Sequence, residues 1–294
     1  MEESRRKLKN RNIAIVIIFL ILSLLLFLFF LHRSYQKEKT IRVLKIRQKA
    51  QFKTISFAMN IFQDEYGDYP PSEALDPNGQ PYCGAMKLSE AMMGPDLLGF
   101  HPDSVFRADG MDATSTKQVY PIPPSTDNLK VRLGPLQQYD TANPNRLLDI
   151  YGSGNTGPFN ENHFVLCDVY PKKRPSGRKT GMPILYYKAN ISNTEHDVNN
   201  PNNPENIYNY KDNQALLSLG VPWKPNVQHP LFINPKIFYA MTKDREVFTR
   251  SEPYRKDSYI LISAGFDGLY GTADDICNFE WKRSVIENLD KTEN

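Results

Sequence analysis

The residues best suited to chemistry lie in a polar, glycine-rich stretch near the C-terminus. Residues 263–279 read SAGFDGLYGTADDICNF and follow the apolar run at 259–262. Three aspartates stand on the two sides of a glycine-bearing turn in this stretch: Asp267, Asp274 and Asp275. Carboxylate oxygens are the ligands that a hard cation such as Ca²⁺ prefers. The same composition also makes a solvated turn in which Gly265 and Gly268 take positive φ, so the spacing alone leaves both interpretations open.

The spacing of these oxygens is not that of an EF-hand. That loop needs oxygen ligands at positions 1, 3 and 5 and a glutamate at position 12. Counted from Asp267, positions 3 and 5 are Leu269 and Gly271, which carry no side-chain oxygen. A calcium site in this stretch therefore needs a different arrangement of ligands.

The remaining nucleophiles and bases form no recognisable catalytic motif. The histidines and cysteines are scattered along the chain: His32, His101, His163, His196, His229, Cys83, Cys167 and Cys277. No CxxC pair is present, which argues against a zinc site, and three cysteines allow one disulfide and one free thiol. His163 and Cys167 share one face of an expected strand, where packing is the ordinary role. We expect a protein that is not an enzyme.

An apolar segment near the N-terminus is long enough to cross a membrane. Residues 13–31 read IAIVIIFLILSLLLFLFFL and are apolar except for Ser23. At a rise of about 1.5 Å per residue they span about 28 Å, close to the roughly 30 Å hydrocarbon thickness of a bilayer. A signal peptide has a shorter apolar region followed by small residues, whereas His32 and Arg33 follow here. We expect an uncleaved anchor that binds membrane lipid.

Charge is divided unevenly along the chain. The net charge is +3, yet residues 50–294 hold 24 Lys and Arg against 30 Asp and Glu, a balance of −6. The basic residues gather on both sides of the apolar segment, so the positive-inside rule does not fix its orientation. An acidic main domain argues against nucleic acid as a partner.

The apolar segment is expected to continue as one long helix. No Gly or Pro occurs before Gly67, and apolar residues keep helical spacing after the segment: Ile41, Leu44, Phe52, Ile55, Met59, Phe62 and Tyr66. Gly67, Pro70 and Pro71 then end the helix. The pattern predicts one helix over residues 13–66, with an amphipathic second half that packs on a domain.

The rest of the chain contains both strand signals and loop signals. Residues 72–158 are irregular, with short helices expected at 85–93 and 143–150. Three β-branched and aromatic segments are expected to form an antiparallel sheet: residues 163–170, 183–189 and 258–263. A long inserted loop containing NNPNNPENIYNY and a small helix or strand at 231–241 separates the second strand from the third.

Two motifs in this order resemble those of a known family. YGDYPPS follows the long helix at 66–72, and an S-x-G-x-D-G-x-x-G-T-x-D-D-I pattern begins at Ser263, after the last strand. The chain resembles the pseudopilins of type II secretion, and in particular the major pseudopilin. The likeness covers residues 13–72 and about 160–280. It implies a non-enzymatic component of a bacterial type II secretion or type IV pilus-like system, whose partners are other pseudopilins, secretion-system components or an exported protein.

The resemblance also implies an α+β fold of the type IV pilin class, with a long N-terminal membrane-spanning helix packed on a small antiparallel sheet. The chain would then comprise a basic cytoplasmic tail (1–12), a transmembrane helix (13–31), its amphipathic continuation (32–72) and a pilin-like domain (73–294) with insertions at about 73–158 and 191–250. A single-pass protein of the bacterial inner membrane with a periplasmic domain is expected.

In the major pseudopilin, the loop after the last strand binds a structural calcium ion. A backbone carbonyl before the first glycine and side chains on both arms of the loop hold that ion. Carried over to this chain, the resemblance implies Ala264 through its carbonyl, Asp267, Thr272, and Asp274 or Asp275.

The N-terminal border departs from the family pattern. Pseudopilins have a Gly followed by Phe-Thr-Leu-Ile-Glu, where a peptidase cuts, and the Glu aids filament assembly. Here the border reads LKNRNIAIVIIF, and no carboxylate lies between Glu3 and Glu38. An alternative function is therefore an uncleaved, membrane-anchored binding module that uses the pilin fold to recognise an envelope partner or exported protein.

Overall fold

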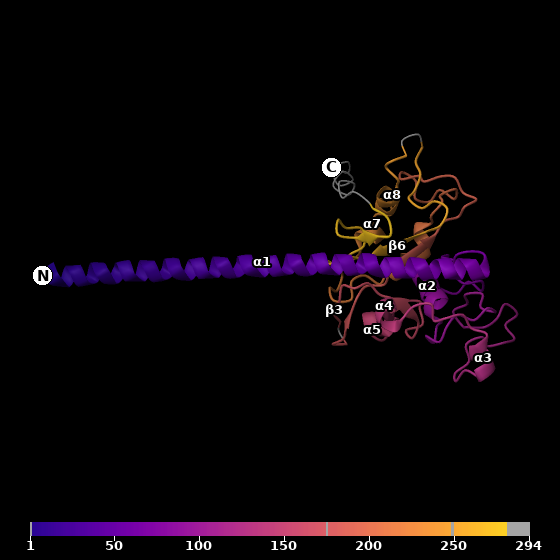
Figure 1. Cartoon of the computed structure of the whole chain (residues 1–294). Coiled ribbons are helices and arrows are strands. Elements are labelled where there is room, and N and C mark those ends of the chain that lie inside the picture. Colours follow the sequence, from indigo (N-terminus) through magenta and orange to yellow (C-terminus); the bar gives the residue numbers. More distant parts are fainter. Residues whose placement is uncertain (1, 175, 248–249, 281–294) are drawn as a thin grey trace. The chain divides into compact units, whose positions relative to one another are not determined.

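The computed structural model describes residues 2–174, 176–247 and 250–280, with side chains from Phe19 onward in these ranges. The chain divides into two compact units, Met1–Ile46 and Arg47–Asn294. One helix, α1 (Glu2–Tyr66), supplies the whole described part of the first unit and enters the second (Figure 1). The second unit mixes short helices with small antiparallel sheets, so the chain is α+β.

The first unit carries an exposed apolar surface. Between Phe19 and Leu31 the large apolar side chains of α1 are 50% to 72% exposed. From Phe19 onward α1 is long and apolar enough to cross a membrane, with a mean hydropathy of 1.6 in its most apolar window, although a signal sequence has the same properties. The expected span at 13–31 lies within this helix; the side chains of residues 13–18 and of the basic tail at 1–12 lie outside the described part.

The last turns of α1 are part of the core of the second unit. A row of apolar residues at helical spacing is buried here: Phe52, Ile55, Ala58, Met59 and Phe62. The helix ends at Tyr66, as the glycine and prolines after it predict. Gly67 has a φ of 79°, and its N–H donates to the Gln63 carbonyl at 2.8 Å. This is the usual left-handed ending of a helix.

Two glutamines of α1 join the helix to the rest of the unit. The Gln51 amide donates to the Cys167 carbonyl at 2.9 Å and to the Thr141 carbonyl at 3.0 Å. The Gln48 side-chain oxygen accepts from the Val169 N–H at 3.0 Å. Both glutamines are buried. They supply hydrogen bonds to backbone groups that have left regular secondary structure, which would otherwise be costly to bury.

The main sheet has three antiparallel strands in the order β5 (Leu185–Lys188), β6 (Tyr259–Ser263) and β7 (Ile276–Cys277). Leu185 lies opposite Ile262, and Ile262 lies opposite Cys277. Every residue of β6 is buried, as expected for a central strand covered on both faces. The buried ring of Tyr259 in β6 lies close to Ser56 of α1.

The first expected strand does not join this sheet as predicted. Only β2 (Phe164–Leu166) forms from residues 163–170, and it pairs with β1 (Pro144–Arg146). An isolated bridge, Cys167 to Pro183, with backbone hydrogen bonds from Ile184 to Leu166 and from Asp168 to Met182, connects it to the residues just before β5. The reason lies in Asp168, whose carboxylate accepts the N–H groups of Tyr170 and Met182 at 3.2 and 3.0 Å. A side chain thereby replaces ladder acceptors and turns the chain away.

Helices were predicted with mixed success. The helix expected at 85–93 is α2 (Gly84–Met93). The helix expected at 143–150 begins later, as α5 (Leu147–Tyr151), because Asn143 is left-handed with a φ of 51° and β1 follows it. Residues 231–241 form two helices, α7 (Pro230–Ile233) and α8 (Lys236–Thr242). The other elements are α3 (Thr126–Lys130), α4 (Tyr139–Ala142), β3 (Lys172–Lys173), β4 (Lys179–Thr180), the 3-10 helix η1 (Tyr210–Asn213) and α6 (Gln214–Leu217).

Replacing Gln51 tests how strongly α1 is bound into the second unit. Gln51→Leu keeps the size of the side chain but removes the donor to the Thr141 carbonyl and leaves the Cys167 carbonyl with the Asn143 amide, at 3.2 Å, as its remaining side-chain donor. We expect a loss of about 1–3 kcal/mol in the free energy of unfolding. The measurement is urea denaturation of the full chain in detergent micelles.

The matched control is Asn60→Leu, the same kind of change at an exposed position of α1. It should leave the unfolding midpoint nearly unchanged. Equal midpoints for Gln51→Leu and Asn60→Leu would show that the glutamine contacts contribute nothing.

Candidate metal centre

The loop that joins β6 to β7 has a backbone that only glycine allows at three positions. Gly265, Gly268 and Gly271 have φ values of 64°, 76° and 89°. A Cβ at Gly265 would lie 2.3 Å from the Asp274 carbonyl oxygen, and one at Gly268 would lie 2.3 Å from the Trp223 ring. The sequence correctly predicts positive φ at the first two glycines. Space as well as φ therefore fixes the path of this loop.

Side chains from both arms of the loop meet. One carboxylate oxygen of Asp274 accepts from the Asp267 N–H at 2.9 Å, and the other accepts from the Thr272 hydroxyl at 2.6 Å. The Asp267 carboxylate accepts from the Leu269 N–H at 2.7 Å. Burial, followed by the neighbouring charge of Asp274, raises the pKa of Asp267 to about 6. The fold thus brings together three of the predicted ligands: Asp267, Thr272 and Asp274.

Asp275 and Ala264 have other roles in the same loop. The Asp275 carboxylate is buried and accepts from the Gly271 N–H at 2.7 Å. Burial raises its pKa well above the usual range, with smaller contributions from the charges of Asp274 and Asp267. The Ala264 carbonyl accepts from the Gly268 N–H at 3.2 Å. Of the two adjacent acids, Asp274 lies beside Asp267, while Asp275 braces the turn from inside.

The donor set of this loop suits a hard cation. Its converging ligands are oxygen atoms, and a carboxylate oxygen that accepts a hydrogen bond keeps a second lone pair for an ion. Neither Asp267 nor Asp274 forms an ion pair with a Lys or Arg of the described residues. Within the same residues, no three His, Cys, Asp or Glu side chains form a ready metal-binding cluster. The arrangement therefore has oxygen ligands for Ca²⁺ but needs carbonyl or water oxygens to complete the shell.

Residues that the sequence did not assign to the loop support it from outside. The Trp223 ring lies over Gly268, and the Arg174 guanidinium lies over that ring at 4.6 Å. Arg174 is buried and donates to the Thr180 carbonyl at 2.8 Å and to the Gly181 carbonyl. A lone tryptophan in an expected insertion carried no signal of this role. The stack covers one side of the loop with apolar and cationic groups.

A buried acid supports the loop from below. The Asp168 carboxylate accepts from the Ser263 hydroxyl at 2.9 Å, and Ser263 in turn accepts from the Gly265 N–H at 3.2 Å. Burial raises the pKa of Asp168 to about 7. The signal in the sequence was a lone aspartate within an apolar strand-like run. Asp168 connects the end of β2 to the first residues of the loop.

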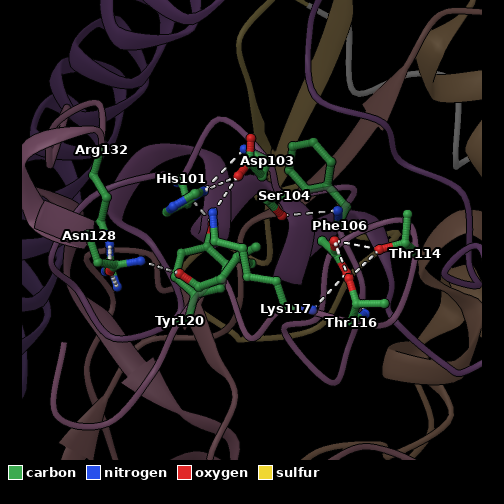
Figure 2. A network of polar contacts seen from close by, with 12 residues as sticks. His101, Asp103, Ser104, Phe106, Thr114, Thr116, Lys117, Tyr120, Asn128 and Arg132 are labelled. Atoms are coloured by element: carbon green, nitrogen blue, oxygen red, sulfur yellow. Dashed lines mark hydrogen bonds and ion pairs between the residues drawn. The ribbon is translucent and has the colours of Figure 1, made fainter. Parts of the chain in front are cut away.

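A second buried acid lies in the expected insertion at 73–158. Glu90 of α2 accepts from the hydroxyls of Tyr82 at 2.7 Å, Tyr120 at 3.0 Å and Ser104. Figure 2 shows the surrounding network, in which Lys117 reaches Asp103 at 2.7 Å. Burial raises the pKa of Glu90. Because three hydroxyls already satisfy this carboxylate, it fastens the residues before and after α2 to that helix, within the insertion.

The thiols and the expected strand-face pair make no common site. Cys83, Cys167 and Cys277 are buried free thiols, so the disulfide that the cysteine count allowed does not form. His163 binds the Ala108 carbonyl through its ring nitrogen at 3.1 Å. The Cys167 thiol instead faces the Val165 carbonyl at 4.0 Å, and burial raises its pKa. The two side chains therefore have separate partners.

The chain matches no protein-family model, no curated protein and no solved structure. The function must therefore be argued from its own residues and fold.

The raised pKa of Asp267 predicts a pH dependence of stability. Between about pH 4 and pH 6 the folded protein keeps a proton that the unfolded chain has lost, so the free energy of unfolding falls as pH rises through this interval and stays lower above it. Asp267→Asn removes this contribution, so its free energy of unfolding should fall less as pH rises than that of the unchanged protein. The measurement is urea denaturation of the full chain with a chelator at pH 5 and pH 7.5.

The control for this prediction is Asp257→Asn, a change at an exposed acid outside the loop. It should keep the decline of the unchanged protein. Asp168 also has a raised pKa, and because neither Asp267 nor Asp257 contributes to it, its contribution cancels in the comparison. Identical declines in the unchanged protein and Asp267→Asn would contradict the assignment.

Proposed function

We propose that this protein is a membrane-anchored, non-enzymatic pseudopilin-like component of a type II secretion or type IV pilus-like system. The observation that carries the proposal is that α1 has two roles, as an exposed apolar segment and as part of the core of the second unit. One uninterrupted helix presents an exposed apolar segment at Phe19–Leu31 and then fills the core of an α+β unit. That unit has a small antiparallel sheet whose last connection is the acidic glycine loop. This combination is the one that the family resemblance predicts.

The proposed location follows from the same helix. Burying the apolar side chains of Phe19–Leu31 in lipid removes a surface that is costly to keep in water. With the basic tail at 1–12 in the cytoplasm, the orientation that the family resemblance implies, α1 would cross the inner membrane of a bacterium once and place the second unit in the periplasm. There the unit would meet other pseudopilins, secretion-system components or an exported protein.

The loop between β6 and β7 is proposed to hold a structural calcium ion. Asp267, Thr272 and Asp274 would supply side-chain oxygens and Ala264 its carbonyl, while Asp275 holds the turn. The bound ion would place a positive charge beside the carboxylates of Asp267 and Asp274. It would tie the two arms of the loop together at the end of the main sheet. Its contribution is to stability, not to a reaction.

A calcium titration tests this part of the proposal. At a free Ca²⁺ concentration of 100 times the dissociation constant, binding to the folded state should add about 2.7 kcal/mol to the free energy of unfolding. The measurement is thermal and urea unfolding of the full chain in nanodiscs, with and without chelator. Asp267→Asn and Asp274→Asn should lose the calcium effect.

Asp257→Asn should respond to calcium as the unchanged protein does. Mg²⁺ at the same concentration should stabilise less, since it demands a tighter octahedral shell and gives up water reluctantly. No change in the unfolding midpoint on chelation would remove the metal from the proposal and leave the anchored pilin-like unit in place.

The alternative function is an uncleaved, single-pass binding module. It is favoured by the border at 8–19, which has neither the Gly nor the Thr-Leu-Ile-Glu run of the family. The large irregular segments of the second unit favour it as well, because they add surface that a compact filament subunit does not need. In this function the pilin fold would present a recognition surface while the helix stays in the membrane.

Crosslinking in intact cells separates the two functions. Cysteine pairs or a short amine crosslinker should give ladders with other pilin-like proteins if the chain enters a filament, and shearing should release it with them. Recovery of monomers alone, retained in the membrane fraction with the N-terminus intact, would reject assembly and favour the binding module.

A further inference from the structure

A polar groove in the second unit lies away from the acidic loop. Its volume is about 570 Å³, within the roughly 300–1,000 Å³ of small-molecule sites. It is lined by the segment that follows α1, by the end of β5 and by the inserted loop that leads to η1. None of its lining residues belongs to the loop between β6 and β7.

Asparagine side chains recur along the wall of the groove. Six of them line it: Asn190, Asn193, Asn202, Asn203, Asn206 and Asn209. Two are used to hold the wall itself. The Asn193 amide donates to the Asn206 carbonyl at 2.8 Å, and the Asn206 side-chain oxygen accepts from the Asp197 N–H at 2.7 Å. The inserted loop is therefore a fixed surface, held by side-chain to backbone hydrogen bonds.

The other four asparagines present unused donors in fixed orientations. The side-chain oxygen of Asn203 accepts from the Glu205 N–H at 3.0 Å, and that of Asn209 accepts from the Lys211 N–H at 3.1 Å. Asn202 likewise accepts from the Tyr210 hydroxyl, and Asn190 from the Ser192 N–H. Among the described residues, the amide NH₂ groups of these four asparagines donate to no protein acceptor. Because the side-chain oxygen of each amide accepts a hydrogen bond, the orientation of its NH₂ group is restricted.

Acidic side chains also line the groove. Asp212 is buried and accepts from the Ser72 hydroxyl at 2.5 Å; burial raises its pKa to about 8. Asp68 pairs with Lys188. The lining has three acids (Asp68, Glu73 and Asp212) and two lysines (Lys188 and Lys211). This balance gives no positive field, so a phosphate or another polyanion is not the ligand that the groove favours.

Two further classes of ligand fit poorly. The tyrosines that line the groove, Tyr208 and Tyr239, are fully buried, and Ile191 is the one exposed large apolar side chain of the lining, so a mainly apolar ligand finds little surface. A peptide could add to the open edge of β5, but that edge is already occupied. The Lys188 N–H donates to Ser72 at 2.9 Å, and the Tyr186 carbonyl accepts from Asn213 at 2.7 Å.

We propose that this groove binds a short, neutral oligosaccharide. Sugar hydroxyls donate and accept, so neighbouring hydroxyls can use the amide donors of the asparagines and the oxygens of the acidic side chains at the same time. Ile191 offers an apolar contact for the C–H face of one ring. Such a site depends on many directed hydrogen bonds and little on charge, which is what the lining supplies.

The test is a titration of the full chain in phospholipid nanodiscs, which carry no sugar headgroup. The probes are neutral oligosaccharides of two to six units, α- and β-linked, built from glucose or N-acetylglucosamine; binding is measured by saturation-transfer NMR and calorimetry. We expect saturable binding of at least one probe. The double variant Asn202→Ala with Asn203→Ala should weaken that binding about tenfold or more, through loss of fixed donors.

The control is Asn162→Ala, an exposed asparagine outside the groove, which should bind as the unchanged protein does. Matching thermal unfolding of all variants shows that the fold is kept. Absence of binding across the probes overturns the proposal, as does equal binding by the double variant. Binding of only a sulfated oligosaccharide or only a peptide overturns it too, since either would require a different lining.

Discussion

The second unit depends on one face of α1 being buried. The apolar row from Phe52 to Phe62 contributes side chains to the core. Gln48 and Gln51 determine which segments pack beside it, because their side chains form hydrogen bonds with backbone groups of Thr141, Cys167 and Val169. Those three positions lie in two segments, one around Thr141 and one at Cys167 and Val169, which have little regular structure of their own. The helix therefore acts as a template for segments that short strands alone would not hold together.

Buried acids perform a similar task elsewhere in the unit. Asp168, Glu90 and Asp212 each accept from a serine hydroxyl, and Glu90 and Asp168 add tyrosine hydroxyls or backbone N–H groups. None of these three carboxylates forms an ion pair with a Lys or Arg among the described residues. Such carboxylates direct irregular backbone without requiring a second buried charge, at the cost of the raised pKa values that burial produces.

The sequence predicted what local periodicity controls. The long helix and its end at Gly67 follow from the absence of Gly and Pro before it, and positive φ at Gly265 and Gly268 follows from turn chemistry. The position of β2 could not be predicted, since Asp168 diverts the chain through contacts with distant residues. Nor could the cover of Trp223 over Gly268 or the aimed amides of the groove. These contacts depend on which distant segments pack together, and the local sequence pattern does not indicate that.

The three buried thiols can report local opening of the second unit. Cys83 lies at the start of α2, Cys167 follows β2, and Cys277 lies in β7, so each belongs to a different part of the fold. All are buried, and burial raises the pKa of Cys83 to about 11, which keeps the unreactive thiol form. The rate at which each sulfur becomes available to an alkylating reagent therefore reports how often its surroundings separate.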